Sequence, residues 1–326
     1  MNTLPMNIPP ANPSTIESAR QLLEFLYSIR GKKTLSGQHN MIHNMSFNSE
    51  EVQRITGHYP AVWGGEWGFS DSRHNVDNIA YRPALLEEIQ RQHVAGRIVV
   101  ITYHQANPTI GEPCDLETGV FGKLTSDQWD DLFTEHSAIR LCWEAQVDRL
   151  AEAFLCLQNK QIPIIFRPYH EMNANWFWWG GNTVLFMALW NLIYDRFVNH
   201  HKINNLLWAW NPDEPRLGVA DFYPGHSTVD LLGTDIFPDH DRPDTYPQEW
   251  YDQMISIAEG RPVALSENSR VPTSEDLDRM PWSYWMGWDR ATFFDNTNSA
   301  LKKIFLDERV ISDSTKPHTP LPGVRQ

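Results

Sequence analysis

The stretch IPIIFRPYHE, residues 162–171, shows the pattern that decides the fold: an apolar run that ends in polar and charged side chains. The same pattern recurs along the chain, and a longer stretch with helical spacing of apolar residues usually follows it. Runs of this kind are typical of parallel strands that are buried on both faces. Eight of them are present: Lys33–His39, Pro60–Trp67, Ile98–Gln105, Ile162–Glu171, Asn205–Pro212, Val229–Phe237, Pro262–Asn268 and Tyr284–Arg290.

The stretches between these runs predict helices. Pro83–Ala95 opens with a proline, which suits the first position of a helix, and Gly96 follows where a helix-ending glycine is common. Eight strands that alternate with helices predict an α/β fold, a (β/α)8 TIM barrel. An open doubly wound sheet is the alternative, but no glycine fingerprint follows the first run. The other predicted helices are Ser137–Gln158, Thr183–His200, Trp250–Glu259 and Asn298–Leu306.

We expect residues 1–326 to form one catalytic domain, because barrels of this kind commonly run past about 250 residues as a single unit. Residues 1–30 would be an N-terminal extension with a helix, and residues 311–326 a proline-rich tail on the outside. Residues 106–136 are polar and rich in Gly and Asp. This segment follows the third strand, so it should overlie the carboxyl-terminal mouth of the barrel.

The composition limits the partners that the chain can take. With 41 acidic and 27 basic residues, the net charge is −14. A surface this negative repels nucleic acid and anionic lipid, and no apolar run approaches the roughly 20 residues that span a bilayer. The first 15 residues lack the basic and apolar regions of a secretory signal, so we expect a cytoplasmic protein or a mature secreted form. Three cysteines without CxxC spacing argue against a disulfide framework, and we expect a monomer.

The ends of the predicted strands carry a ring of hydrogen-bonding and aromatic side chains. Barrel enzymes place their catalytic groups at the carboxyl ends of the strands. A ring of this composition suits a sugar, which needs partners for its hydroxyls and a flat surface for stacking. In strand order the ends supply Gln38, His39, Glu66, Trp67, His104, His170, Glu171, Asn211, Asp213, Asp235, Glu267 and Trp288.

Two glutamates stand out in this ring. Glu171 ends the fourth run and Glu267 lies one residue before the end of the seventh, so the two side chains face each other across the mouth. Cleavage of a glycosidic bond needs a proton donor for the leaving oxygen and a second carboxylate on the opposite face. In retaining enzymes the two carboxyl groups lie about 5–5.5 Å apart, which lets the second attack the anomeric carbon.

The sequence around the first glutamate also resembles a known family. RPYHEMN, residues 167–173, and WFWWG, residues 176–180, closely resemble the acid/base signature of glycoside hydrolase family 26, most members of which are β-1,4-mannanases. The resemblance covers about Lys33 to Val310. It includes LSGQ at 35–38, WAWN at 208–211, GTD at 233–235 and ALSE at 264–267.

The resemblance implies a role for each matched position. Glu171 would be the acid/base and Glu267 the nucleophile of a retaining enzyme that cleaves β-1,4-mannosidic bonds in mannan or manno-oligosaccharides. His170 would orient the acid, and His104 would contact the sugar at the cleavage point. Two tryptophans would stack on pyranose rings and two polar residues would line the wall: Trp176, Trp288, Asn211 and Asp235.

Two positions depart from the family pattern. Members commonly have a tyrosine that donates to the nucleophile where this chain has Phe237, so we expect another donor, with Tyr246 and His104 as candidates. The ring of Phe237 would then shape a subsite. The arrangement WGGEW at 63–67 is also unusual, and both a subsite role and a packing role are open for Trp67.

Other functions are weaker interpretations of the same residues. His170 and Glu171 begin an HExxH zinc motif, but the second histidine is replaced by Ala174, so we expect no metal and no cofactor. A non-catalytic carbohydrate-binding protein on this scaffold would be expected to lack one of the two glutamates, and both are present. A β-1,3-1,4-glucanase or a β-xylanase remains possible, because the fold and the catalytic pair do not choose the sugar.

Overall fold

The computed structural model describes residues 7–70, 78–216, 218–239 and 245–314. Within them, eight parallel strands form a closed barrel. Neighbouring strands are hydrogen-bonded in chain order, and the last returns to the first through Leu35 and Tyr284. Each strand lies inside one of the eight predicted runs, which confirms the (β/α)8 prediction. The barrel strands are β1 (Thr34–His39), β3 (Val62–Glu66), β4 (Ile98–Tyr103), β5 (Ile164–Pro168), β6 (Leu206–Trp210), β7 (Leu231–Asp235), β8 (Val263–Asn268) and β9 (Tyr284–Gly287).

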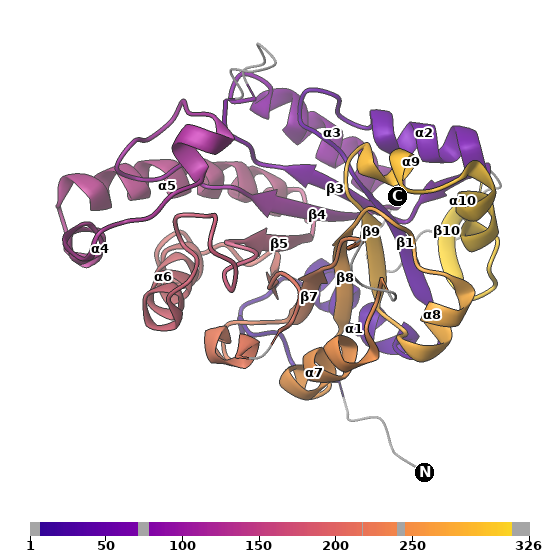
Figure 1. Cartoon of the computed structure of the whole chain (residues 1–326). Helices are drawn as coiled ribbons and strands as arrows, with labels where there is room; N and C mark the ends of the chain where they lie inside the picture. Colours follow the sequence, from indigo (N-terminus) through magenta and orange to yellow (C-terminus); the bar gives the residue numbers. More distant parts are fainter. Residues whose placement is uncertain (1–6, 71–77, 217, 240–244, 315–326) are drawn as a thin grey trace.

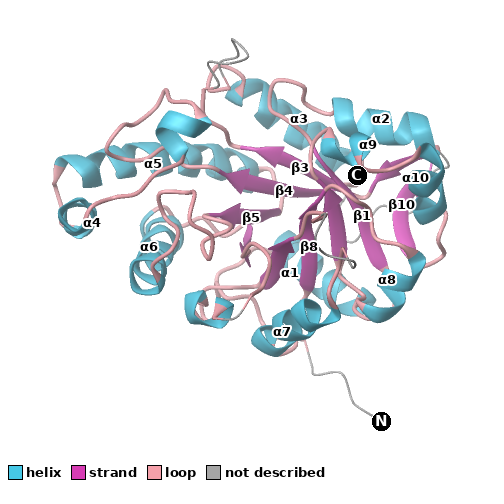
Figure 2. Ribbon diagram, viewed as in Figure 1, coloured by secondary structure: helices cyan, strands magenta, loops and turns pink. Residues whose placement is uncertain are grey.

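Helices surround the strands on the outside (Figures 1 and 2). The five predicted helices are present. Their ends are shifted by at most two residues in four of them, and the predicted helix Thr183–His200 is an α-helix to Asp195 and a π-helix over Arg196–His200. Gly96 has a φ of 85°, as expected of a glycine that ends a helix. The larger helices are α2 (Phe47–Thr56), α3 (Arg82–Val94), α5 (Ala138–Asn159), α6 (Thr183–Asp195), α7 (Gln248–Ala258) and α10 (Asn298–Phe305), and shorter ones are α4 (Ser126–Phe133), α8 (Ser274–Arg279) and α9 (Ala291–Phe294).

Two short strands extend the sheet beside β1. Strand β10 (Val310–Ser314) pairs parallel with the start of β1, and β2 (His58–Pro60) pairs antiparallel with β10. The predicted tail from residue 311 therefore begins with the last residues of β10, which lies beside β1 and outside the eight strands of the closed barrel. Strand β3 pairs with β1 only from Gly37 onward, so β10 satisfies the backbone of Thr34 and Leu35 instead. The rest of the predicted tail, residues 315–326, lies outside the described residues.

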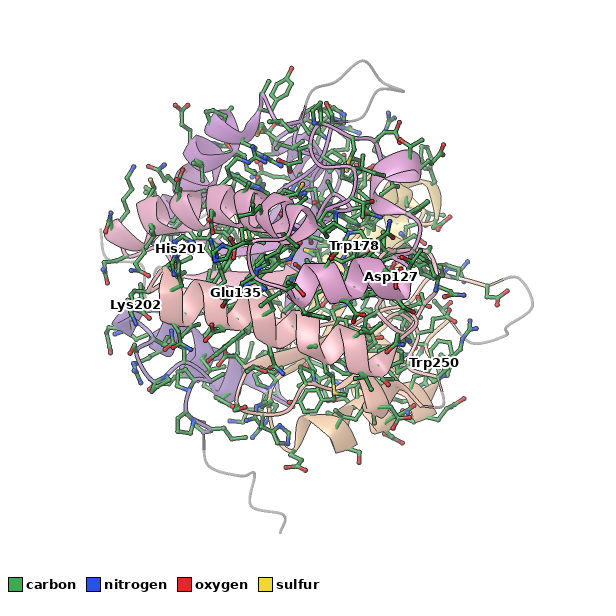
Figure 3. All side chains as sticks on the ribbon, turned by 90° about the vertical axis from the view of Figure 1, so that its left-hand side faces the viewer. Asp127, Glu135, Trp178, His201, Lys202 and Trp250 are labelled. Atoms are coloured by element: carbon green, nitrogen blue, oxygen red, sulfur yellow. The ribbon has the colours of Figure 1, made fainter. Side chains whose placement is uncertain are left out.

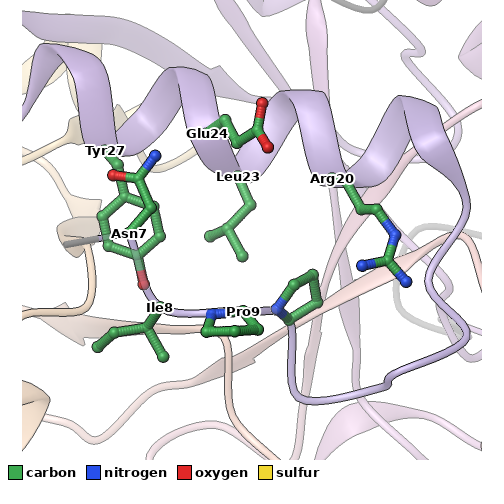
Figure 4. Close-up of a pocket in the computed structure, with 8 residues that line it drawn as sticks. Asn7, Ile8, Pro9, Arg20, Leu23, Glu24 and Tyr27 are labelled. Carbon is green, nitrogen blue, oxygen red and sulfur yellow. The ribbon is translucent and has the colours of Figure 1, made fainter.

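Helix α1 (Glu17–Ile29) closes the amino-terminal end of the barrel. Its ends are fixed to the loops that precede the strands: Ile16 donates its N–H to Asn204 before β6, and Arg30 donates to the carbonyl of Gly260 before β8. Its buried leucines join one apolar cluster with the first residues of the strands. Residues 7–10 run alongside the helix, and a small pocket lies between them (Figure 4).

The segment 106–136 lies at the opposite, carboxyl-terminal side, as predicted. Its backbone bonds to the loop that follows β5: Trp178 donates to the carbonyl of Val120, and Gly122 donates to the carbonyl of Trp176. Trp178 also packs against Trp129 of α4, with ring centroids 5.8 Å apart. Figure 3 labels Trp178 and, on α4, Asp127. The segment thus supports the loop that carries three of the predicted site residues, His170, Glu171 and Trp176. No helix in the described part of the chain has the length and apolar character to cross a membrane.

Candidate active site

A buried arginine joins two carboxyl groups at the centre of the barrel mouth. Arg167, on β5, donates from Nη1 to Asp235 at 3.0 Å and from Nη2 to Thr102 at 2.9 Å. Nη2 also donates to Oε1 of Glu267. The arginine side chain is fully buried, and both carboxyl groups are buried with it. Strands β4, β5, β7 and β8 therefore meet at this one guanidinium.

The electrostatics of this group are dominated by burial. Burial raises the pKa of Glu267 to about 8, while the charge of Arg167 and its hydrogen bond act in the opposite direction. Burial also raises the pKa of Asp235 well above its ordinary value, and the neighbouring Glu267 adds to that rise. Because arginine stays protonated in proteins, at least one of the two carboxyl groups must be ionised to pair with it.

Ligand atoms of His170, Asp235 and Glu267 lie within 4.8 Å of one another, which is close enough for a metal ion. The guanidinium of Arg167, however, contacts both carboxyl groups of this set. A cation placed among them would face the positive charge of the arginine at short range. These residues therefore suit an arginine-bridged pair of carboxylates better than a metal centre.

Glu171 lies in the loop just after β5 in a left-handed conformation, with a φ of 56°. Its backbone N–H donates to the carbonyl of Asn211 at 2.7 Å, which holds this turn against β6. Trp176 donates its indole N–H to Oε2 of Glu171 at 2.8 Å. The backbone bond and the indole bond together fix the direction of the carboxyl group.

Burial raises the pKa of Glu171 well above its ordinary value. Asp235 and Asp213 act in the same direction, and the hydrogen bond from Trp176 opposes them. Burial is the largest of these causes, and the repulsion between the two glutamates contributes to the raised pKa of Glu267.

Two histidines meet edge to face beside the glutamates. The ring centroids of His104 and His170 lie 4.4 Å apart, and Phe177 packs 5.2 Å from each of them. Burial, together with the charge of Arg167, lowers the pKa of His170 well below its ordinary value, so this ring is neutral. Its Nε2 lies 3.8 Å from Oε1 of Glu267. The ring of His104 instead directs Nδ1 to Glu66 at 2.9 Å.

Aromatic rings flank this group on two sides. Trp176 is 41% exposed, and Trp288, at the end of β9, is half-buried and stacks on His39 with centroids 4.1 Å apart. Trp67 is different, because it is only 5% exposed and its ring is covered by the guanidinium of Arg82 at 4.7 Å. Of the two roles considered for Trp67, these contacts favour packing.

The remaining predicted residues lie deeper in the wall. Asn211 and Asp235 are fully buried, and a Cβ at Gly233 would come within 2.2 Å of Oδ1 of Asn211. Both therefore belong to the support of the mouth more than to its open surface. Phe237 follows β7 and is half-buried.

A donor to Glu267 is present, as expected, but it is neither of the two residues considered for this role. Tyr246 donates its hydroxyl to the carbonyl of Arg270, and His104 is engaged with Glu66, so neither candidate serves Glu267. The donor to Glu267 is Arg167. The sequence contained a signal for it, since an arginine in the middle of an apolar strand must have a buried partner.

Comparisons with known proteins identify the family of the chain. The sequence model of glycosyl hydrolase family 26 matches residues 11–315. GH26A from a Muricauda species has a similar structure, with a TM-score of 0.85 and 34% identity over 92% of this chain and 98% of that one. A β-mannanase from a symbiotic protist of the termite Reticulitermes speratus, solved with a gluco-manno-oligosaccharide, has a TM-score of 0.79 and 26% identity over 93% and 96% of the two chains.

A curated relative is mannan endo-1,4-beta-mannosidase A of Piromyces sp, which is 28% identical over 94% of this chain and 50% of its own length. The chain thus spans about half the length of the Piromyces relatives that it matches. The family match, in contrast, covers nearly the whole chain, because it extends over residues 11–315. On this evidence the chain belongs to glycosyl hydrolase family 26.

Proposed function

We propose that the protein hydrolyses β-1,4-mannosidic bonds in mannan or manno-oligosaccharides with retention of configuration. The observation that carries this proposal is the different bonding of two buried carboxyl groups, one just after β5 and one on β8. Trp176 donates a neutral indole N–H to Glu171, whereas the guanidinium of Arg167 donates to Glu267. Burial favours the protonated form of both carboxyl groups, and the charged donor opposes this at Glu267 by favouring its ionised form.

These two states are the ones that a double displacement requires. Protonated Glu171 gives its proton to the glycosidic oxygen while the carboxylate of Glu267 attacks the anomeric carbon. The bond from that carbon to the leaving oxygen breaks, and an ester to Glu267 forms. Formation of the ester removes the negative charge of Glu267, which lowers the pKa of Glu171. Glu171 can then take a proton from water, whose oxygen releases the sugar from Glu267.

The substrate assignment rests on the relatives and on the aromatic surfaces of the mouth. The Piromyces relative is named for mannan, and the termite-symbiont relative was solved with a gluco-manno-oligosaccharide. Trp176 and Trp288 offer flat faces on which pyranose rings can stack. A panel of mannan, glucomannan, xylan and mixed-linkage glucan tests this assignment: faster release of reducing ends from xylan or mixed-linkage glucan than from the two mannans would contradict it.

The roles of the two glutamates are tested by changing the leaving group. With Glu171→Ala, we expect hydrolysis of manno-oligosaccharides to fall by about a thousandfold or more, and hydrolysis of activated aryl mannosides to fall much less, because an activated leaving group needs little protonation. With Glu267→Ala, both substrates should lose activity and no glycosyl-enzyme should be seen by mass spectrometry. Glu249→Ala, at an exposed position on α7, is the control. Equal losses on both substrates in Glu171→Ala would exclude it as the acid.

A further inference from the structure

Glu66 forms a double hydrogen bond with His104. Its side chain, at the end of β3, accepts the backbone N–H of His104 at 3.1 Å with one oxygen and lies 2.9 Å from Nδ1 of the ring with the other. The register of the barrel produces this contact, because Glu66 pairs with Thr102, and His104 lies two residues further along the chain, just after β4. Both side chains are nearly buried.

The position of the glutamate is tightly limited. A Cβ at Gly68 would lie 3.3 Å from Cγ of Glu66, so even the smallest side chain there would press on it. The backbone of the next residue is also fixed, since Trp67 donates its N–H to the carbonyl of Thr102 at 2.9 Å. The carboxylate is thus preorganised against the histidine before any ligand arrives.

A carboxylate offers only acceptors, so Nδ1 of His104 must carry the hydrogen of this bond. In the neutral imidazole, Nε2 then has a free lone pair. Within the described residues, Nε2 of His104 has no hydrogen-bond partner and remains open to solvent. The ring is held in place by its edge contacts with His170, Phe177 and Trp288, so this lone pair has a defined direction.

His170, the neighbour of His104, lacks a carboxylate partner for its Nδ1 within the described residues. Nδ1 of His170 is buried and has no hydrogen-bond partner in the described part of the chain, and its Nε2 is 3.8 Å from the nearest carboxylate oxygen. Nothing fixes the position of the proton on that ring. Of the two histidines in contact, therefore, only one has its tautomer set by the protein.

We propose that Glu66 is a positioning residue that locks His104 in the Nδ1–H tautomer, so that Nε2 accepts a hydrogen from a hydroxyl of the sugar at the cleavage point. The proposal deepens the function proposed above and rests on it for the identity of the ligand. The tautomer itself is a property of the free protein. Glu66, at the end of the second barrel strand, thereby helps to bind the sugar without touching the reacting atoms.

The variant Glu66→Gln makes a sharp test because it reverses the bond. An amide has one acceptor and one donor end. If its oxygen keeps the backbone N–H of His104, its NH2 group faces Nδ1, which must then become an acceptor. The ring proton moves to Nε2, and a donor replaces the acceptor that faces the sugar. Glu112→Gln is the matched control, since Glu112 is equally buried but pairs with Arg82 away from the histidines.

The readout is the nitrogen NMR spectrum of 15N-histidine-labelled protein without substrate, with the signal of His104 assigned by its loss in His104→Gln. We expect the Nδ1–H form in the parent and in Glu112→Gln, and the Nε2–H form in Glu66→Gln. Each variant is also assayed at its own pH optimum, because the charge of Glu66 contributes to the raised pKa of Glu267. There kcat/KM on manno-oligosaccharides should fall about tenfold to a hundredfold in Glu66→Gln alone.

Two results would overturn the proposal. An Nε2–H or mixed tautomer of His104 in the parent would show that Glu66 does not lock the ring. A tautomer switch in Glu66→Gln without loss of kcat/KM would show that Nε2 does not serve the sugar. A parent that has the expected tautomer but does not hydrolyse mannan would count against the proposed function and leave the lock established.

Discussion

The two ends of the barrel are equally buried and chemically opposite. At the amino-terminal end, Leu22 and Leu26 of α1 pack with Leu35, Val100 and Leu207 of the strands, and the cluster is apolar throughout. At the carboxyl-terminal end, the ends of the strands and the loops after them bury Arg167 together with several histidines and carboxyl groups, among them His170, Asp235 and Glu267. Apolar burial stabilises the fold, whereas burial of like charges costs stability. The comparison indicates that the amino-terminal end supplies stability to the fold. The carboxyl-terminal end carries the reactive groups, whose burial lowers that stability.

The largest expected effect comes from breaking each end separately. Leu26→Ala should lower the free energy of unfolding by about 2–5 kcal/mol, because it leaves a cavity in the apolar end, while kcat of the folded enzyme stays unchanged. Glu171→Gln should do the reverse: kcat should be lost, and the free energy of unfolding should rise, because the neutral amide avoids the cost of burying a carboxylate. Urea unfolding and steady-state kinetics on the same samples measure both quantities.

The pH dependence of this gain follows from the pKa of Glu171. That pKa is raised in the folded protein above its ordinary value of 4.5, so the folded state binds a proton that the unfolded state has released. The cost is absent below the unfolded pKa and grows as the pH rises toward the folded pKa. The stability difference between Glu171→Gln and the parent should therefore widen from pH 5 to pH 8. A difference that is constant or narrows over this range would contradict the assigned burial cost.

A smaller effect is expected from changing Arg167, which links Asp235 and Glu267 at the carboxyl-terminal end. Arg167→Lys keeps a positive charge but cannot bond Asp235 and Glu267 at once in the planar geometry of the guanidinium. The pKa of Glu267 should rise further, so the acidic limb of the kcat/KM profile, where this carboxylate becomes protonated, should move to higher pH. At the pH optimum we expect a loss of about tenfold to a hundredfold.

Arg196→Lys, which breaks a partly exposed contact with Asp148 on the outside of the barrel, is the control for this change. It should leave the pH profile in place. If Arg167→Lys lowered activity without moving the acidic limb, the arginine would support the shape of the mouth but would not set the charge of Glu267.

The same contrast explains how far the sequence alone could predict the structure. The strands were predictable because buried parallel strands are continuous apolar runs with polar ends, and the two glutamates were predictable from their places at such ends. Helix α2 was missed because its buried face includes Asn48 and Ser49, so it has no apolar stripe. Strand β10 was missed because it fills a gap in pairing beside β1, which depends on register and not on composition.

The sequence predicts which polar residues line the mouth, but not which of them bond to each other. Arg167 lies within the family signature, yet its role as the donor to Glu267 depends on which strands face each other at one level of the barrel. The same holds for Glu66, whose contact with His104 follows from the β3–β4 register. Trp67 could be assigned to packing only when Arg82 was seen to cover its ring. Pairings of this kind are long-range, so local patterns do not contain them.

The smallest expected effect concerns Phe237, where relatives commonly have a tyrosine that donates to the nucleophile. Arg167 already supplies Glu267 with a charged donor, so a second hydroxyl has little left to stabilise. We therefore expect Phe237→Tyr to change kcat/KM on manno-oligosaccharides by less than about threefold, which corresponds to roughly 0.65 kcal/mol. Phe237→Leu is the companion variant, because it removes the ring without adding a donor. A rise of about tenfold or more in Phe237→Tyr would mean that Arg167 alone leaves the nucleophile short of a donor. The carboxyl-terminal end of the barrel would then limit the rate of the reaction as well as the stability of the fold.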